Sequence, residues 1–135
     1  MLIKSGYQYT VFLEHKVGAL AKVVCRLKNE NVNILAASGS ASADGGILRI
    51  VVERENSHLK NIFKNIGLYP VKTPIIVIML TKNSNQDLEY VLSYLAKNNI
   101  NLQSIFWSDC SQNKELCVAL IPDRFEEACM LLEEL

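Results

Sequence analysis

Asn31-Val32-Asn33-Ile34 returns 68 positions later in the chain as Asn99-Ile100-Asn101-Leu102. The apolar positions around this stretch return at the same offset: Leu20 as Leu88, Val23 as Val91, Leu27 as Leu95 and Leu48 as Leu116. A match at one fixed period indicates that each half of the chain forms one structural unit. We therefore predict two tandem domains, residues 1–73 and residues 74–135.

The composition is that of a compact folded protein, because 50% of the residues are hydrophobic and 21% are charged. The 14 basic and 14 acidic side chains balance, and no dense run of Lys or Arg occurs, so we expect no nucleic-acid partner. The longest apolar run, Ile75 to Leu80, is too short to span a bilayer, and the first residues show no signal-peptide pattern. These features predict a cytoplasmic protein without membrane association.

The four cysteines are Cys25, Cys110, Cys117 and Cys129, and they form no CxxC pair and match no zinc-binding spacing. We therefore expect no bound metal, and we interpret the cysteines as reduced thiols that mostly fill the core. A redox pair of Cys110 and Cys117 across a hairpin stays open as the alternative.

The first half of the chain predicts the order strand, helix, strand, strand, helix, strand. Period-two and helical spacings of apolar residues mark the elements, and Asp44-Gly45-Gly46 is typical of a hairpin turn. This is the ferredoxin-like βαββαβ order of the α+β class, with an antiparallel sheet and both helices on one face. The predicted strands are 7–13, 33–42, 47–53 and 69–73, and the predicted helices are 19–28 and 58–66.

The second half repeats this order but ends one strand early. Its predicted strands are 74–80, 101–108 and 115–121, and its helices are 86–97 and 123–135, the latter with Asp123 as its N-cap. The counterpart of the fourth strand would fall beyond residue 135. We therefore expect the second unit to lack its last strand, and we predict that residues 1–5 or another chain complete its sheet edge.

Apolar residues occur on both faces of the predicted strands. Ile75 and Val77 point one way while Ile76 and Ile78 point the other, so the face without helices does not alternate to polar residues. Such an apolar face requires a cover. We therefore expect the two units to pack together and the chain to form a homodimer.

This sequence lacks the characteristic residues of three other families that share the topology. The loop from Glu14 to Gly18 has no Arg to hold a phosphate, as in an acylphosphatase, and no Cys pair, as in a metallochaperone. The strand from Leu48 to Val52 has no aromatic side chain for stacking on RNA bases. The topology therefore leaves the function to be decided by the site.

Three motifs in the first unit resemble those of the ACT domain, a small-molecule sensing module of amino-acid metabolism. They are Val17-Gly18-Ala19-Leu20, Asn31-Val32-Asn33-Ile34 and Gly46-Ile47-Leu48-Arg49. The chain resembles a stand-alone tandem ACT protein with no catalytic domain joined to it. The resemblance implies a regulatory protein that binds an amino acid, with a possible enzyme of amino-acid metabolism as its partner.

The loop before the first helix is the candidate ligand site. Gly18 lets the backbone adopt a conformation closed to other residues, and the free N–H groups of the helix start suit a carboxylate. The resemblance places the ligand between this loop and the second strand of a neighbouring unit, where Asn33 would meet an ammonium group. Each candidate also has a purely structural interpretation, which stays open. Gly18 would serve the turn alone, and His15 would be a solvated loop residue. Asn33 would end the helix–strand connection, and Leu20 and Ile34 would belong to the core. The candidates are His15, Lys16, Val17, Gly18, Ala19, Leu20, Asn33, Ile34 and Leu35.

The equivalent loop of the second unit, Lys82 to Asp87, has Gln86 in place of Gly18, so we expect no ligand there. No catalytic group is expected, since neither histidine, His15 or His58, accompanies a partner that suggests a relay. We predict a non-enzymatic regulator, without a cofactor, that binds a small amino acid or related metabolite. Two alternatives are an interaction module that acts by contact alone and an enzyme whose site forms between subunits.

Overall fold

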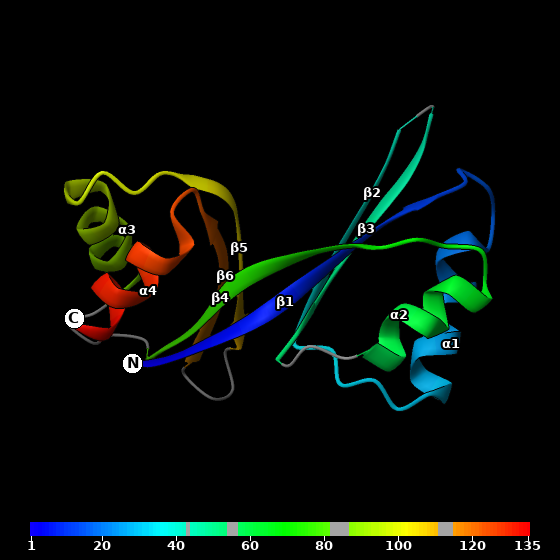
Figure 1. Ribbon diagram of the computed structural model, residues 1–135, viewed down its shortest axis with the longest axis horizontal. Helices are drawn as coiled ribbons and strands as arrows, with labels where there is room; N and C mark the ends of the chain where they lie inside the picture. The colour runs from blue at the N-terminus through cyan, green and yellow to red at the C-terminus, as the bar shows by residue number, and fades with distance from the viewer. Residues whose placement is uncertain (43, 54–56, 82–86, 111–114) are drawn as a thin grey trace. The chain divides into compact units, whose positions relative to one another are not determined.

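The computed structural model describes residues 1–42, 44–53, 57–81, 87–110 and 115–135 (Figure 1). It divides the chain into two compact units, which we name the N-unit, Gly6–Thr73, and the C-unit, Met1–Ser5 with Pro74–Leu135. This division differs from the predicted domains 1–73 and 74–135 in the first five residues. The strand order is β2-β3-β1-β4-β6-β5.

Each unit has the predicted ferredoxin-like order of strands and helices. The N-unit orders its strands β2-β3-β1-β4 and the C-unit orders them β1-β4-β6-β5, because β1 and β4 pass through both units. The elements are β1 (Leu2–Leu13), α1 (Ala19–Asn29), β2 (Ala36–Ser42), β3 (Gly45–Val52), α2 (Ser57–Asn65), β4 (Val71–Thr81), α3 (Leu88–Lys97), β5 (Leu102–Cys110), β6 (Glu115–Pro122) and α4 (Phe125–Glu133).

The fourth strand of the C-unit comes from the start of the chain. β1 begins at Leu2 rather than at the predicted Tyr7, and its residues up to Ser5 belong to the C-unit. Ile3 packs against the C-unit core. Of the two covers that we predicted for this sheet edge, residues 1–5 or another chain, the structure has the first.

β4 makes the reciprocal passage. It runs unbroken from Val71 to Thr81, where the sequence predicted two strands that met at Pro74. Its first residues belong to the N-unit, and there the ammonium of Lys72 lies 5.1 Å from the centre of the Tyr7 ring. β1 changes units at Gly6, where an added Cβ would lie only 2.5 Å from the carbonyl oxygen of Val52. Glycine at this position therefore allows a close backbone approach.

Three helices end in the same turn. The residues that follow their last turns, Asn31, Gly67 and Asn99, have φ of 56°, 79° and 60°. Glycine and asparagine tolerate this left-handed conformation best, which explains why the repeat keeps Asn31 as Asn99. After α1, the N–H of Asn31 donates to the carbonyl of Lys28 and that of Val32 to Leu27. After α2, the N–H of Gly67 donates to the carbonyl of Lys64 and that of Leu68 to Phe63. After α3, the N–H of Asn99 donates to the carbonyl of Ala96 and that of Ile100 to Leu95. These paired bonds form Schellman motifs.

The predicted N-cap of α4 is wrong. The residue at that position is Arg124, which makes no side-chain cap, and the helix begins at Phe125. Asp123 instead pairs with Asn101: its carboxylate accepts from the N–H of Asn101 at 3.2 Å, and its own N–H donates to the carbonyl of Asn101 at 2.9 Å. Asp123 therefore joins the end of β6 to the start of β5.

Both cores lie between a sheet and its two helices. In the N-unit, one buried cluster joins β1 and β3 to α1 and α2, which lie side by side in Figure 1. In the C-unit, a second cluster joins β4 and β6 to α3 and α4. The apolar residues that we predicted to need a cover are buried too, although they lie outside both clusters. Ile75 and Val77 are two of them, and Val51, Ala119 and Ile121 are likewise buried outside both clusters.

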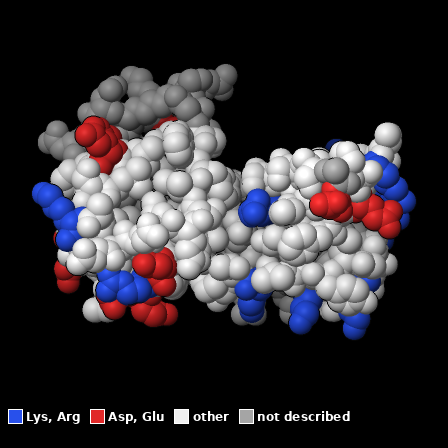
Figure 2. All heavy atoms as spheres, turned by 90° about the horizontal axis from the view of Figure 1, so that it is seen from above, with Lys and Arg blue, Asp and Glu red and all other residues white. Residues whose placement is uncertain are grey.

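The surface drawn in Figure 2 mixes basic and acidic side chains with wide uncharged areas between them. The described residues visible on this face form no continuous basic stripe of the kind that nucleic-acid-binding proteins use. Among the described residues, no helix has the length and apolar character that crossing a membrane requires.

Candidate functional site

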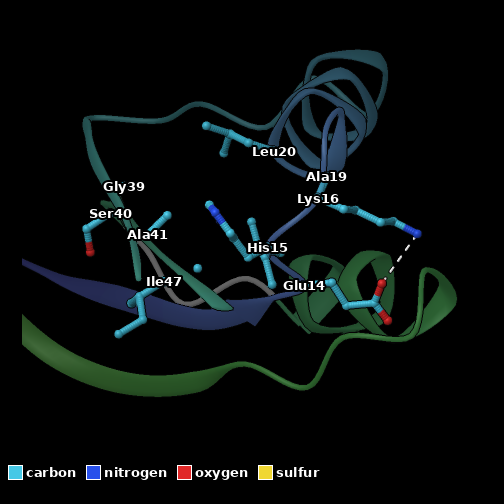
Figure 3. A pocket seen from close by; sticks show the side chains of 11 residues that line it. Glu14, His15, Lys16, Ala19, Leu20, Gly39, Ser40, Ala41 and Ile47 are labelled. Atoms are coloured by element: carbon cyan, nitrogen blue, oxygen red, sulfur yellow. Dashed lines mark ion pairs between the residues drawn. The ribbon is translucent and has the colours of Figure 1, made fainter. Parts of the chain in front are cut away.

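A hollow of about 270 Å³ lies in the N-unit between the loop that follows β1, the start of α1 and the β2–β3 hairpin (Figure 3). Ligand pockets commonly measure about 300–1,000 Å³, so this space suits a small metabolite. Its lining residues are Leu13, Glu14, His15, Lys16, Ala19, Leu20, Gly39, Ser40, Ala41, Gly46 and Ile47.

The start of α1 is open on this side. Gly18 is its N-cap, with φ of +86°, no side-chain cap and no atom within 4 Å of an added Cβ. The positive φ means that the turn itself favours glycine, and the open space means that no neighbouring side chain covers Gly18. The first turn contains no acidic residue that would neutralise the positive end of the helix dipole.

The charged side chains beside the hollow pair with each other. The ammonium of Lys16 lies 3.3 Å from a carboxylate oxygen of Glu14, and both side chains are exposed. In Figure 3 this pair lies away from the hairpin, whereas His15 extends between Leu20 and Ala41. The apolar and imidazole groups therefore face the hollow, and the ion pair stands at its rim.

The structure brings four of the nine predicted residues to this hollow: His15, Lys16, Ala19 and Leu20. Gly18 lies next to them in the chain, whereas the Val17 side chain is fully exposed. The remaining three, Asn33, Ile34 and Leu35, lie in the connection between α1 and β2 and outside the lining.

The sequence reasoning missed the side of the hollow that the β2–β3 hairpin forms. Gly39 pairs with Leu48, and Ala41 pairs with Gly46. Leu48 belongs to the core beneath the helices, so Gly39 and Ala41 lie on that same face of β2. The available signal was the series of small residues at alternate positions Ala37, Gly39 and Ala41, which leaves space beside α1.

The first helix of the C-unit begins differently. Asp87 caps α3, and its carboxylate accepts from the N–H of Tyr90 at 2.9 Å. Glu89 adds a second acidic group in the first turn. At α3 one first-turn donor, the N–H of Tyr90, and the helix dipole are thus already met by acidic side chains, whereas no side chain caps α1 and its first turn has no acidic residue. Gln86, which we expected to block a ligand here, lies outside the described residues.

The cysteines fall in different environments, and among the described residues no group of His, Cys, Asp and Glu side chains could hold a metal. Cys25 and Cys129 are free thiols, but Cys25 is exposed on α1, so the core-filling interpretation is wrong for it. Burial raises the pKa of the Cys129 thiol, and the charges of Glu126 and Glu133 raise it further. On the hairpin, Cys117 pairs with Ser108, and the Cys110 side chain lies outside the described residues.

The family model of the ACT domain pair matches residues 4–118 of this chain. Protein BT0572 from Bacteroides thetaiotaomicron has a similar structure, with a TM-score of 0.83 and 25% identity over 98% of this chain and 89% of that protein. The ligand-free regulatory subunit of aspartate kinase from Thermus thermophilus gives a TM-score of 0.67 at 11% identity, over 98% and 95% of the two chains.

A structure of aspartokinase alpha and beta subunits gives a TM-score of 0.59 at 15% identity, over 97% of this chain and 95% of that one. No curated protein matches the sequence. At these low identities the two aspartate kinase structures share the fold with this chain, and the likeness extends no further than that.

Proposed function

Because the chain belongs to the family of ACT domain pairs, we propose that it is a non-catalytic regulatory protein that binds a small amino acid or related metabolite beside the start of α1. The observation that carries the proposal is the open, uncapped helix start at Gly18 next to a hollow of about 270 Å³. The N–H of Ala19 donates to the carbonyl of Lys16 at 3.3 Å, and the other N–H groups at the start of the helix suit a carboxylate. The regulatory subunit of aspartate kinase from Thermus thermophilus has the same fold, which supports a regulatory role.

The nine candidate residues divide into two groups in this proposal. His15, Lys16, Ala19 and Leu20 line the hollow, and Gly18 and Val17 shape the turn beside it. The connection from Asn33 to Leu35 lies outside the lining. In our proposal this connection contacts the ligand that is bound to the helix start of a neighbouring unit. Ligand binding would then favour one arrangement of a homodimer, or of a complex with an enzyme of amino-acid metabolism, in proportion to its differential affinity for the two arrangements.

Thermal unfolding in the presence of each of the twenty amino acids tests the proposal. A ligand that binds only the folded protein raises the melting temperature. Gly18→Asp should abolish this rise, because its carboxylate would occupy the helix start and repel the ligand carboxylate. Gly67→Asp is the matched control, since Gly67 also has a positive φ, +79°, and open space around it, but it ends α2, whereas Gly18 begins α1 next to the lining residue Ala19.

The control separates binding from stability. Both variants force an L side chain into the left-handed region and should lose about 1–2 kcal/mol of folding free energy. Only Gly18→Asp should lose the ligand response. An equal response in both variants would place the ligand elsewhere.

A second candidate function is regulation by protein contact without a ligand. The capped start of α3, where Asp87 already holds the N–H of Tyr90, favours it for the C-unit. A complete absence of thermal shifts with all twenty amino acids, together with binding of an intact enzyme partner, would favour this function over the first.

A further inference from the structure

The hollow of the N-unit has apolar walls on two sides. Leu20 extends over it from α1, and Leu13 and Ala19 contribute from the end of β1 and the first helical turn. Leu20 is 47% exposed, although leucine on a helix that faces a sheet is normally buried. An apolar group placed in the hollow would therefore cover surface that the N-unit itself leaves in contact with water.

The opposite wall is made by small residues. Gly39 and Ala41 present a hydrogen and a methyl group on the face of β2 that looks toward α1. In Figure 3 the side chains of Ser40 and Ile47 turn to the other side of the hairpin, so they add no polar group to the space. The size of the hollow on this side thus depends on the small residues Gly39 and Ala41.

The lining offers no free charge for a charged ligand side chain. Its two charged residues, Glu14 and Lys16, neutralise each other at 3.3 Å on the rim. Apart from the His15 imidazole, which also faces the hollow, a carboxylate, ammonium or guanidinium buried against Leu13, Leu20 and Ala41 would find no partner for the hydration that it loses, and such a loss costs several kcal/mol. An aliphatic side chain incurs no such cost.

We propose that the ligand of this site is an amino acid with an aliphatic side chain of the size of valine, leucine, isoleucine or methionine, and that Gly39 sets the upper limit of that size. This inference rests on the proposed function, because it names the class of the ligand bound there. The inference concerns only the hollow beside α1, because all the lining residues on which it depends belong to the N-unit.

Gly39→Val tests the size limit directly. An added Cβ at Gly39 would find its nearest neighbours at 3.9 Å and 4.0 Å, and its φ lies outside the left-handed region, so the variant should fold. Ser38→Val is the matched control, because it adds the same side chain to the same strand at the neighbouring position, which points to the opposite face and lies outside the lining.

Isothermal titration calorimetry of the intact protein tests both the aliphatic ligand class and the size limit at Gly39. The ligands are leucine, isoleucine, methionine, valine, alanine, aspartate, lysine and serine. We expect the tightest binding among the first four. Gly39→Val should weaken leucine binding about ten- to a hundred-fold, the cost of overfilling a packed space, and should weaken alanine binding far less. Ser38→Val should leave both affinities within about twofold, as is usual for a substitution away from the site.

The outcomes separate the two proposals. Tightest binding of aspartate, lysine or serine would overturn the aliphatic ligand class and leave the amino-acid sensor standing. Equal weakening of leucine and alanine by Gly39→Val would overturn the size limit at Gly39. No binding of any amino acid would overturn the proposed function and this inference with it.

Discussion

The first helices of the two units end alike and begin differently. α1 and α3 both end in a Schellman motif whose left-handed residue is an asparagine, Asn31 in one and Asn99 in the other. At their starts, α1 has an uncapped glycine and α3 has a capping aspartate. The repeat has therefore kept the positions that the fold needs and changed the positions where a ligand would reach the backbone.

This contrast shows how a duplicated unit can divide its tasks. A capped helix start is more stable, because each satisfied terminal N–H contributes about 1 kcal/mol. An uncapped start gives up that stability and keeps donors free for another acceptor. The C-unit has the arrangement that favours stability, and the N-unit has the one that the proposed function requires.

The units also share two strands, and the largest expected effect tests that sharing. Ile3 lies in the half of the chain that the repeat assigns to the first unit, yet it packs on the core of the second. Ile3→Asp should therefore lower the free energy of unfolding by about 2–3 kcal/mol, through lost apolar burial and a carboxylate next to the core. Hydrogen exchange should show the loss of protection first in β4 and β6 of the C-unit.

Leu2→Asp is the control for this prediction, because Leu2 is 53% exposed and adjacent in the same strand. It should change stability by less than about 1 kcal/mol, as surface substitutions usually do. Loss of protection confined to α1 and α2 of the N-unit in Ile3→Asp would contradict the strand assignment.

The shared helix ends predict a smaller effect that is equal in both units. Asn31→Val and Asn99→Val each place a β-branched residue at positive φ, which should cost about 1–2 kcal/mol. Chemical denaturation of the two variants measures the cost. Asn31→Gly and Asn99→Gly are the controls and should leave stability close to that of the original protein, because glycine adopts this conformation freely. Unequal losses in the two valine variants would break the structural equivalence of the units.

Local patterns were sufficient to predict the elements of both units. Helical spacing at Val23 and Leu27 and the repeat of Asn31 as Asn99 depend on contacts within a few residues, and the structure confirms the helices that they predicted. Several boundaries differ, and β2, for example, begins at Ala36 instead of the predicted residue 33. Two of the differences, in β1 and β4, arise because distant parts of the chain determine them. β1 extends back to Leu2 since a strand of the C-unit needs its neighbour, and β4 continues through Pro74 for the same reason.

The candidate site was only half visible in the sequence for a related reason. The loop at Gly18 can be predicted from the local sequence, because a strand, a glycine and an amphipathic helix follow one another there. Gly39 and Ala41 carry no such local signal, and their place beside α1 follows from the pairing of β2 with β3. In the sequence alone, a small residue in an edge strand indicates only a weak strand propensity. The pairing register is needed to show which element the residue faces.

The smallest effect concerns the capped helix start of the C-unit. Asp87→Ala removes the acceptor for the N–H of Tyr90 and should cost about 1 kcal/mol in the free energy of unfolding, measured by chemical denaturation. Asp87→Asn should recover most of that loss, because the amide oxygen of asparagine also accepts from the helix start. The variant pair thus separates the cap from the charge. If alanine and asparagine were equally destabilising, the helix dipole rather than the hydrogen bond would account for Asp87, and α1 and α3 would then differ in electrostatics more than in capping.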